Sequence, residues 1–380
     1  MEFSPTPDQV ALQDSVRRYC NEKYDLGGKA PIIRGSEGFS RMHWNAFAEL
    51  GWLGAGLPDD VGGTNGSAIE SALILGQFGR HLVVEPYWSC IVFAGHLIDC
   101  YAGSDQRLEL LAPMVAGRLL IAVAHNEVGS AGSLECVSTR AIEVNGRYRL
   151  SGNKSLVFGA PFADKLVISA RIYGDARDQD GVALFVVDRD AAGLRRSDYR
   201  MIDGTAASDL ELNDVEVAST ALLGPIGCGL GGLQSARNQA LVALCAEAVG
   251  AMDGVLWTTR DYLRARRQYG TTLNTMQALQ HRMADMFTEL EMSRSILFRA
   301  LSQLKEKELS KRNIGALSAS IHVAQSGKQI CKNGVQLHGG LGITEDHVIG
   351  QYFKRIAVIS NTFGDLQSKL DECADYLSGT

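Results

Sequence analysis

Arg266-Arg267-Gln268-Tyr269-Gly270, with Gln277 seven residues past the glycine, is the first half of a pattern that decides the fold of this chain. The second half is Gln336-Leu337-His338-Gly339-Gly340-Leu341-Gly342, and Gly364-Asp365-Leu366-Gln367 follows it. An arginine fork can bind a phosphate through two hydrogen bonds, and a glutamine can pair with a flat heterocycle or a ribose. Glycines let a backbone approach such a ligand closely. A solvated arginine and a plain glycine helix cap are the alternatives for each half alone, but the two halves together favour a binding site.

Length and composition predict a soluble globular protein of two or three domains. The chain has 380 residues, of which 46% are hydrophobic and 21% charged, and its net charge is −6. We therefore expect no binding to nucleic acid or to a membrane surface. Eight cysteines are scattered without a CxxC pair or metal-ligand spacing, so no metal site is predicted. The first residues lack the features of a leader peptide and the apolar stretches look too short for a bilayer, so a cytoplasmic location is expected.

The hydrophobic periodicity changes twice along the chain. Residues 1–118 show helical spacing, and residues 119–224 show short β-branched runs between turn signals, with a hairpin at Asn145-Gly146. Residues 225–380 return to helical spacing. We therefore expect an α+β fold that is mainly α, with an N-terminal helical domain, a middle β-barrel or sandwich and a C-terminal four-helix bundle. The long helices of the last domain are expected over 235–267, 277–305 and 314–334.

The glycine-rich segment Gly227-Cys228-Gly229-Leu230-Gly231-Gly232 is not predicted to bind a dinucleotide. A Rossmann fingerprint needs a preceding strand and a crossover to a parallel strand, whereas one long helical pattern follows here. We interpret the segment as a flexible loop that leads into that helix.

The two halves of the signature, together with the order of helical, β and helical zones, resemble the acyl-CoA dehydrogenase family over the whole chain. The resemblance implies FAD as cofactor, an acyl-CoA substrate, a tetramer and an electron-accepting flavoprotein as partner. It also implies that the Arg266 segment crosses a subunit interface, and that Ser133 lies near the substrate. By this resemblance the cofactor-contacting residues are Arg266, Gln268, Tyr269, Gln277, Gln336, Gly339, Gly340, Asp365, Gln367 and Asn126.

Several positions depart from the family pattern. Asn126 stands where the family has a threonine, and Phe158 stands where it has a hydroxyl near the flavin. Phe363 replaces the glutamate that takes the substrate proton in many members, and the family's second location for that base falls near Ala240. Neither residue can accept a proton. Asp365 and Glu127 are the candidate acids for this role.

These departures lead to a first hypothesis and to alternatives. The runs around Phe353 and Phe363 resemble the small subunit of pimeloyl-CoA dehydrogenase and related partner chains of α2β2 tetramers. The first hypothesis is therefore a dehydrogenase subunit that desaturates an acyl-CoA with a base from a catalytic paralogous chain. Dicarboxylyl, branched or ring-bearing acyl groups, in lipid or dicarboxylate catabolism, are the expected substrates. An active homotetramer with a relocated acid, Asp365 or Glu127, and a flavin monooxygenase of the same fold are the alternatives.

Overall fold

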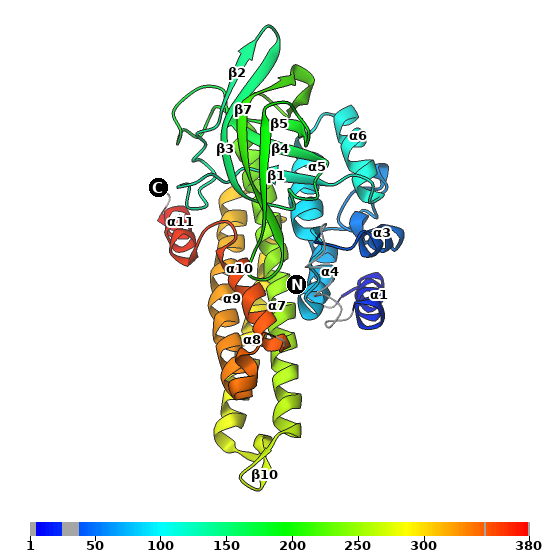
Figure 1. The fold of residues 1–380 in the computed structure, drawn as a ribbon, viewed down its shortest axis with the longest axis vertical. Helices are drawn as coiled ribbons and strands as arrows, with labels where there is room; N and C mark the ends of the chain where they lie inside the picture. The colour runs from blue at the N-terminus through cyan, green and yellow to red at the C-terminus, as the bar shows by residue number, and fades with distance from the viewer. Residues whose placement is uncertain (1–4, 25–37, 346, 379–380) are drawn as a thin grey trace. The chain divides into compact units, whose positions relative to one another are not determined.

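The computed structural model describes residues 5–24, 38–345 and 347–378 (Figure 1). The chain divides into two compact units. A helical unit draws on residues 1–30, 69–83 and 241–380, and a sheet unit draws on residues 31–68 and 84–240. Helix α7 (Gly229–Ala265) begins in the sheet unit and continues into the helical unit.

The described part of the sheet unit contains an eight-stranded sheet. Its strand order is β6-β7-β3-β2-β4-β5-β8, with β1 beside β4, and its buried core is made of alternating aliphatic residues. The hairpin predicted at Asn145-Gly146 is confirmed, because Val144 pairs with Arg147 and both turn residues have positive φ. The strands are β1 (Ile121–Ala124), β2 (Arg140–Val144), β3 (Arg147–Phe158), β4 (Lys165–Arg171), β5 (Val182–Asp188), β6 (Leu194–Arg200), β7 (Ala206–Ala218) and β8 (Leu222–Leu223). The helices are α3 (Arg41–Glu49), η1 (Trp52–Gly54), η2 (Asp59–Val61), the π-helix η3 (Tyr87–Gly95), α5 (His96–Tyr101), α6 (Ser104–Val115) and η4 (Ser219–Ala221).

The glycine-rich segment has a packing role. Helix α7 already begins at Gly229, so the segment is not the loop that the sequence predicts. The Tyr101 hydroxyl donates to the Cys228 carbonyl at 3.0 Å, and a Cβ on Gly232 would lie 2.7 Å from the Tyr101 ring. The glycines therefore let this ring lie directly against the first turns of α7.

Helix α9 lies at the centre of the helical unit, since α8, α10 and α11 all pack against it (Figure 1). The first helix begins at Pro7, where Thr6 caps it and forms a reciprocal capping box with Gln9. The predicted long helices are also present, and α7 and α9 extend beyond their expected limits. The helices are α1 (Pro7–Lys23), α4 (Ala68–His81), α8 (Gln277–Gln303), α9 (Leu309–His338), α10 (Val348–Asn361) and α11 (Leu366–Ser378), with η5 (Leu273–Thr275) and η6 (Gly339–Ile343).

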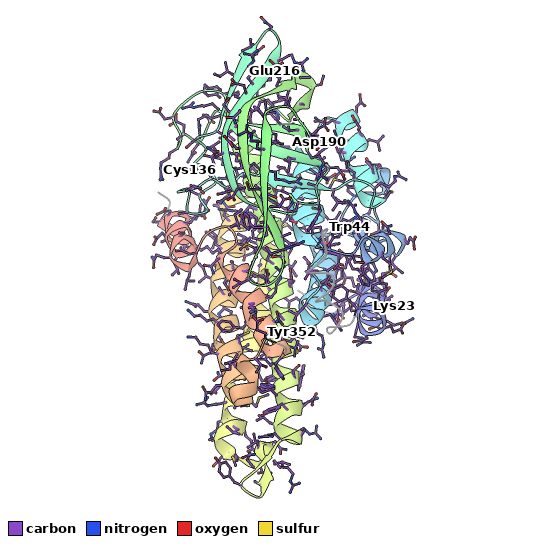
Figure 2. All side chains as sticks on the ribbon, in the orientation of Figure 1. Lys23, Trp44, Cys136, Asp190, Glu216 and Tyr352 are labelled. Atoms are coloured by element: carbon purple, nitrogen blue, oxygen red, sulfur yellow. The ribbon has the colours of Figure 1, made fainter. Side chains whose placement is uncertain are left out.

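Helices α4 and α7 approach each other so closely that their backbones touch. A Cβ on Gly79 would lie 1.8 Å from the Glu247 carbonyl oxygen, and a Cβ on Gly250 would lie 1.8 Å from the Gly76 carbonyl oxygen. Asp253, one turn further along α7, accepts hydrogen bonds from Arg80 of α4 and also from Arg294 and Trp257. Tyr352 of α10, labelled in Figure 2, donates to the Arg80 carbonyl and closes the same cluster.

Helix α7 corrects one expectation from the sequence. By length and composition alone it could cross a membrane, and 94% of its most apolar window is buried. The core helix of a globular protein passes the same test.

Gly79→Ala is expected to lower the free energy of unfolding by about 2 kcal/mol or more, because the new methyl group must push α4 and α7 apart. Gly76→Ala is the matched control on the same helix, since its Cβ would lie 3.8 Å from the Ala246 carbonyl, at ordinary contact distance. The control should be neutral or stabilising by up to about 1 kcal/mol. Denaturant unfolding measures the free energy of unfolding of both variants. Equal values would contradict the close backbone contact between α4 and α7.

Candidate functional site

The first half of the signature ends α7 as an exposed hairpin. Residues Arg266–Gly270 are all exposed, and β9 (Arg267–Gln268) pairs with β10 (Thr271–Thr272). Tyr269 is 88% exposed at the turn, with a positive φ of 54°. Gln277 is exposed at the start of α8, and Figure 1 places the hairpin where α7 and α8 meet. An aromatic ring and an arginine left uncovered in this way are available to a ligand or to another chain.

The second half lies at the end of α9. Gln336 is exposed on the last turn, and Gly339 has φ 61° and ψ −141°, a conformation that essentially only glycine adopts. A Cβ on Gly339 or on Gly340 would meet no atom within 4 Å, whereas one on Gly342 would lie 2.7 Å from the Val335 carbonyl. Internal packing therefore requires Gly342 but does not require Gly340. An open glycine backbone of this kind suits the close approach of a flat ligand.

A groove of about 620 Å³ adjoins this glycine segment. Lys332 and Lys354 place two cations along it, and Glu345 lies 3.6 Å from the Lys354 ammonium. The cations, the amide of Gln336 and the exposed backbone fit the diphosphate and heterocycle of a nucleotide cofactor. The groove is lined by Lys332, Val335, Gln336, Gly342, Ile343, Thr344, Glu345, Gly350, Gln351, Phe353 and Lys354.

The structure joins the two halves of the signature but separates Asp365 and Gln367 from them. Tyr262, one turn before Arg266, stacks on His338 with ring centroids 4.4 Å apart. Asp365 and Gln367 instead begin α11, whose Cys373 contacts Ser318 in the first half of α9. Ser318 lies about 30 Å along the helix from His338. The predicted cofactor residues of the helical unit therefore fall into two places.

Phe363 lies in the turn between α10 and α11. It has a φ of 60°, and Gly364 follows with a φ of 104°. Thr362 before it is buried, and its hydroxyl donates to the Val358 carbonyl at 2.9 Å. The turn therefore presents a half-buried aromatic side chain where the sequence pattern expects a base.

Asp365 is a helix cap. Its carboxylate accepts the Ser368 N–H at 2.8 Å, and this hydrogen bond holds the pKa of the exposed Asp365 below its ordinary value. A general base needs a pKa raised towards the working pH. The weak prediction that Asp365 takes the substrate proton is therefore disfavoured.

Glu127 is the second acid, and it is held in a buried ion pair. Its carboxylate accepts from the Lys154 ammonium and the Thr139 hydroxyl, each at 2.7 Å, and from the Ser138 N–H at 2.7 Å. Burial alone raises the pKa of Glu127, but the Lys154 charge and these hydrogen bonds outweigh it and lower the pKa. Burial lowers the pKa of Lys154 to about 8. Glu127 is thus a structural anion, and this environment disfavours it as a base.

Asn126 does not present a free amide. Its Nδ2 donates to the Ser155 hydroxyl at 3.1 Å, and its Oδ1 accepts from the Ser130 hydroxyl at 3.0 Å. The Asn126 side chain could contact the cofactor, as predicted, only if its amide made a further hydrogen bond beside these two. Ser133 is half-buried. Its N–H donates to the Ser130 carbonyl at 2.9 Å, so residues 130–133 form a hydrogen-bonded turn.

Arg171 is a residue that sequence reasoning missed. Its guanidinium is fully buried and donates to five backbone carbonyls, which belong to Glu135, Val137, Ala176, Asp178 and Asp180. It therefore ties the loop after Ser133 to the loop between β4 and β5. Its position at the end of a buried strand was visible in the sequence, but its carbonyl partners were not.

Two further departures have a physical account within the sheet unit. Phe158 packs edge-on against Trp88 with centroids 5.1 Å apart, so it fills space with a ring where the family pattern expects a hydroxyl. Ala240, at the family's second location for the base, is fully buried on α7.

Comparison with known proteins identifies the family to which the chain belongs. Models of the acyl-CoA dehydrogenase N-terminal, middle and C-terminal domains match residues 6–118, 121–215 and 227–378. The chain belongs to the acyl-CoA dehydrogenase family. Its three-domain architecture is that of the family, whose members depend on FAD and typically assemble as tetramers.

Three relatives are informative. The caffeyl-CoA reductase–Etf complex subunit CarC of Acetobacterium woodii is 25% identical over 320 residues, which cover 82% of this chain and 83% of that protein. The solved Tcur3481–Tcur3483 steroid ACAD is 28% identical, with a TM-score of 0.88 and 98% of each chain covered. The ChsE4–ChsE5 complex from Mycobacterium tuberculosis also has a TM-score of 0.88, at 22% identity over 100% of each chain, and shows the fold. Relatives thus form complexes with other chains and with electron-transferring flavoprotein.

Glu127→Gln is expected to lower the free energy of unfolding by about 3–5 kcal/mol, because it leaves the Lys154 ammonium buried without its counter-charge. Glu216→Gln is the matched control, since Glu216 pairs with Arg149 in the same sheet but both side chains are about half exposed. The control should cost less than about 1 kcal/mol. Chemical denaturation measures the free energy of unfolding of both variants. Similar small losses of stability would show that the buried Glu127–Lys154 pair does not stabilise the fold.

Proposed function

We propose that this chain is an FAD-linked acyl-CoA dehydrogenase subunit that binds the flavin and the substrate but relies on a partner chain for the catalytic base. The single observation that carries the proposal is the environment of three residues. Phe363 stands where the family's sequence pattern has the base, Asp365 caps a helix with a lowered pKa, and Glu127 forms a buried ion pair with Lys154.

The chemistry of desaturation defines what the catalytic base must do. Desaturation removes a proton from Cα and a hydride from Cβ of the acyl thioester, and leaves a Cα–Cβ double bond. Bound FAD supplies the hydride acceptor. The proton needs a carboxylate whose pKa is raised by burial, and in our proposal a paralogous chain contributes it. The electrons then pass to an electron-accepting flavoprotein.

The separation of the cofactor residues supports an assembly with shared sites. Arg266, Gln336 and Gly340 form one exposed corner, which we propose contacts the adenosine diphosphate end of a flavin bound mainly by a neighbouring chain. Asp365 and Gln367 stand at the start of α11, which packs on the first half of α9, and in our proposal they serve a different part of the assembly. In an α2β2 tetramer each of these two sets of residues can contact a different flavin. A homotetramer is the alternative assembly.

Ring-bearing acyl-CoAs are the proposed substrates. The support is that the names of the caffeyl-CoA and steroid relatives refer to ring-bearing groups. A cytoplasmic location stays a prediction.

Phe363→Glu tests the proposal by gain of function. The glutamate restores a carboxylate at the base position, so the FAD-loaded chain alone should turn over an acyl-CoA panel about 100-fold faster than the unmodified chain. The panel contains straight, dicarboxylyl and ring-bearing acyl groups, with an artificial electron acceptor. Phe363→Gln has nearly the same shape and no base, so it should stay as slow as the unmodified chain.

An unmodified chain that turns over alone as fast as with a glutamate-bearing partner chain would contradict the proposal. Asp365→Asn then identifies the relocated acid, because it keeps the cap acceptor but removes the basic carboxylate.

A further inference from the structure

The two halves of the cofactor corner are joined through three aromatic rings. Tyr262 and His338 stack with their ring planes 25° apart, and the Tyr262 hydroxyl donates to the His338 carbonyl at 3.4 Å. The His347 ring lies 4.8 Å from the His338 ring. Its Nδ1 accepts from the Ile349 N–H at 3.3 Å, which fixes it at the start of α10. Three helices therefore meet at His338.

The contacts of His338 define its protonation state. Its side chain is 98% buried, and Nδ1 lies 2.8 Å from the Gly334 carbonyl, which can only accept, so Nδ1 carries the proton. Nε2 is buried with no hydrogen-bond partner among the described residues. Burial lowers the pKa of His338, so the ring is neutral at neutral pH. A neutral imidazole can stack on the Tyr262 ring and lie against the tilted His347 ring without a counter-charge.

The segments on either side of this stack have little packing of their own. Arg266–Gly270 are exposed, and a Cβ on Gly339 or Gly340 would touch nothing. Tyr262 lies four residues before Arg266, and His338 directly precedes Gly339. Gly334 of α9 packs on Val255 of α7 one turn earlier, and the contact between the two rings extends this packing to the segments that carry the arginine and the glycines.

We infer that Tyr262 and His338 are positioning residues that hold the two halves of the adenosine diphosphate corner in register. The inference rests on the proposed function in that FAD is the ligand. Pre-organising both halves reduces the ordering that binding would otherwise require. The rings act through their neighbours and need not touch the cofactor.

Paired substitutions test this inference through FAD affinity. Tyr262→Leu and His338→Leu remove a flat ring, whereas Tyr262→Phe and His338→Phe keep one. We expect the leucine variants to bind FAD three- to tenfold more weakly, from the usual strength of an aromatic pair. The phenylalanine variants should bind within about twofold of the unmodified chain. Quenching of FAD fluorescence on titration with the apo chain measures the affinity.

A stability control separates positioning from general damage. Leu290 is fully buried on α8, and Leu290→Ala should cost about 2–5 kcal/mol of stability without changing FAD affinity while the chain stays folded. Leucine variants that bind FAD like the unmodified chain would overturn the inference. So would a Leu290→Ala variant that weakens binding equally.

Hydrogen exchange provides a readout that does not depend on FAD. Peptides covering 266–276 and 339–345 should exchange faster in the leucine variants than in the phenylalanine variants. If the unmodified chain fails to bind FAD both alone and with a glutamate-bearing partner chain, the proposed function fails, and this comparison still decides the positioning role. Equal exchange in all four variants would overturn it.

Discussion

The backbone contact between α4 and α7 is the constraint on which the helical unit depends. At 1.8 Å from a carbonyl there is no room for a Cβ on Gly79 or Gly250, so the two helices can lie this close only with glycine. That approach brings Arg80 of α4 within reach of Asp253 on α7, which also binds Arg294 of α8. Two turns beyond Asp253, the same helix presents Tyr262 to His338. The cofactor corner is therefore fixed by packing that begins far from it.

Two buried ion pairs neutralise charged groups, one in each unit of the chain. Glu127 and Lys154 neutralise each other inside the sheet unit, and Glu247 and Arg355 do the same in the helical unit. Each carboxylate receives donors that stabilise its ionised form. A catalytic carboxylate requires the opposite environment, with burial and few donors, so that its pKa rises. Phe363 stands where the family's sequence pattern expects that carboxylate.

The sequence predicts the fold well because its signals are local. The change of period separates helical from sheet regions, and Asn145-Gly146 specifies a hairpin. The corner residues follow from motif chemistry, and the structure joins them as exposed segments. The placement of Asp365 and Gln367 away from Gly339 could not be predicted, because it depends on how α11 packs on α9.

Other features of the site could not be predicted from the sequence, because they depend on contacts between residues that are distant in the chain. The five carbonyls around Arg171 come from two loops that are separate in the sequence. The glycines in the first turns of α7 read as a loop in the sequence, because the Tyr101 ring that packs against them comes from a distant segment. Asp365 was a candidate base on position alone, and only its hydrogen bond to the Ser368 N–H identifies it as a cap.

The most direct test of the account is an anaerobic titration of the FAD-loaded chain with ring-bearing acyl-CoAs, followed by the visible absorption of the flavin. The account predicts that the flavin band persists when the chain is alone and bleaches when a glutamate-bearing partner chain is present. Complete and rapid bleaching of the chain alone would contradict it, since the chain would then carry its own base.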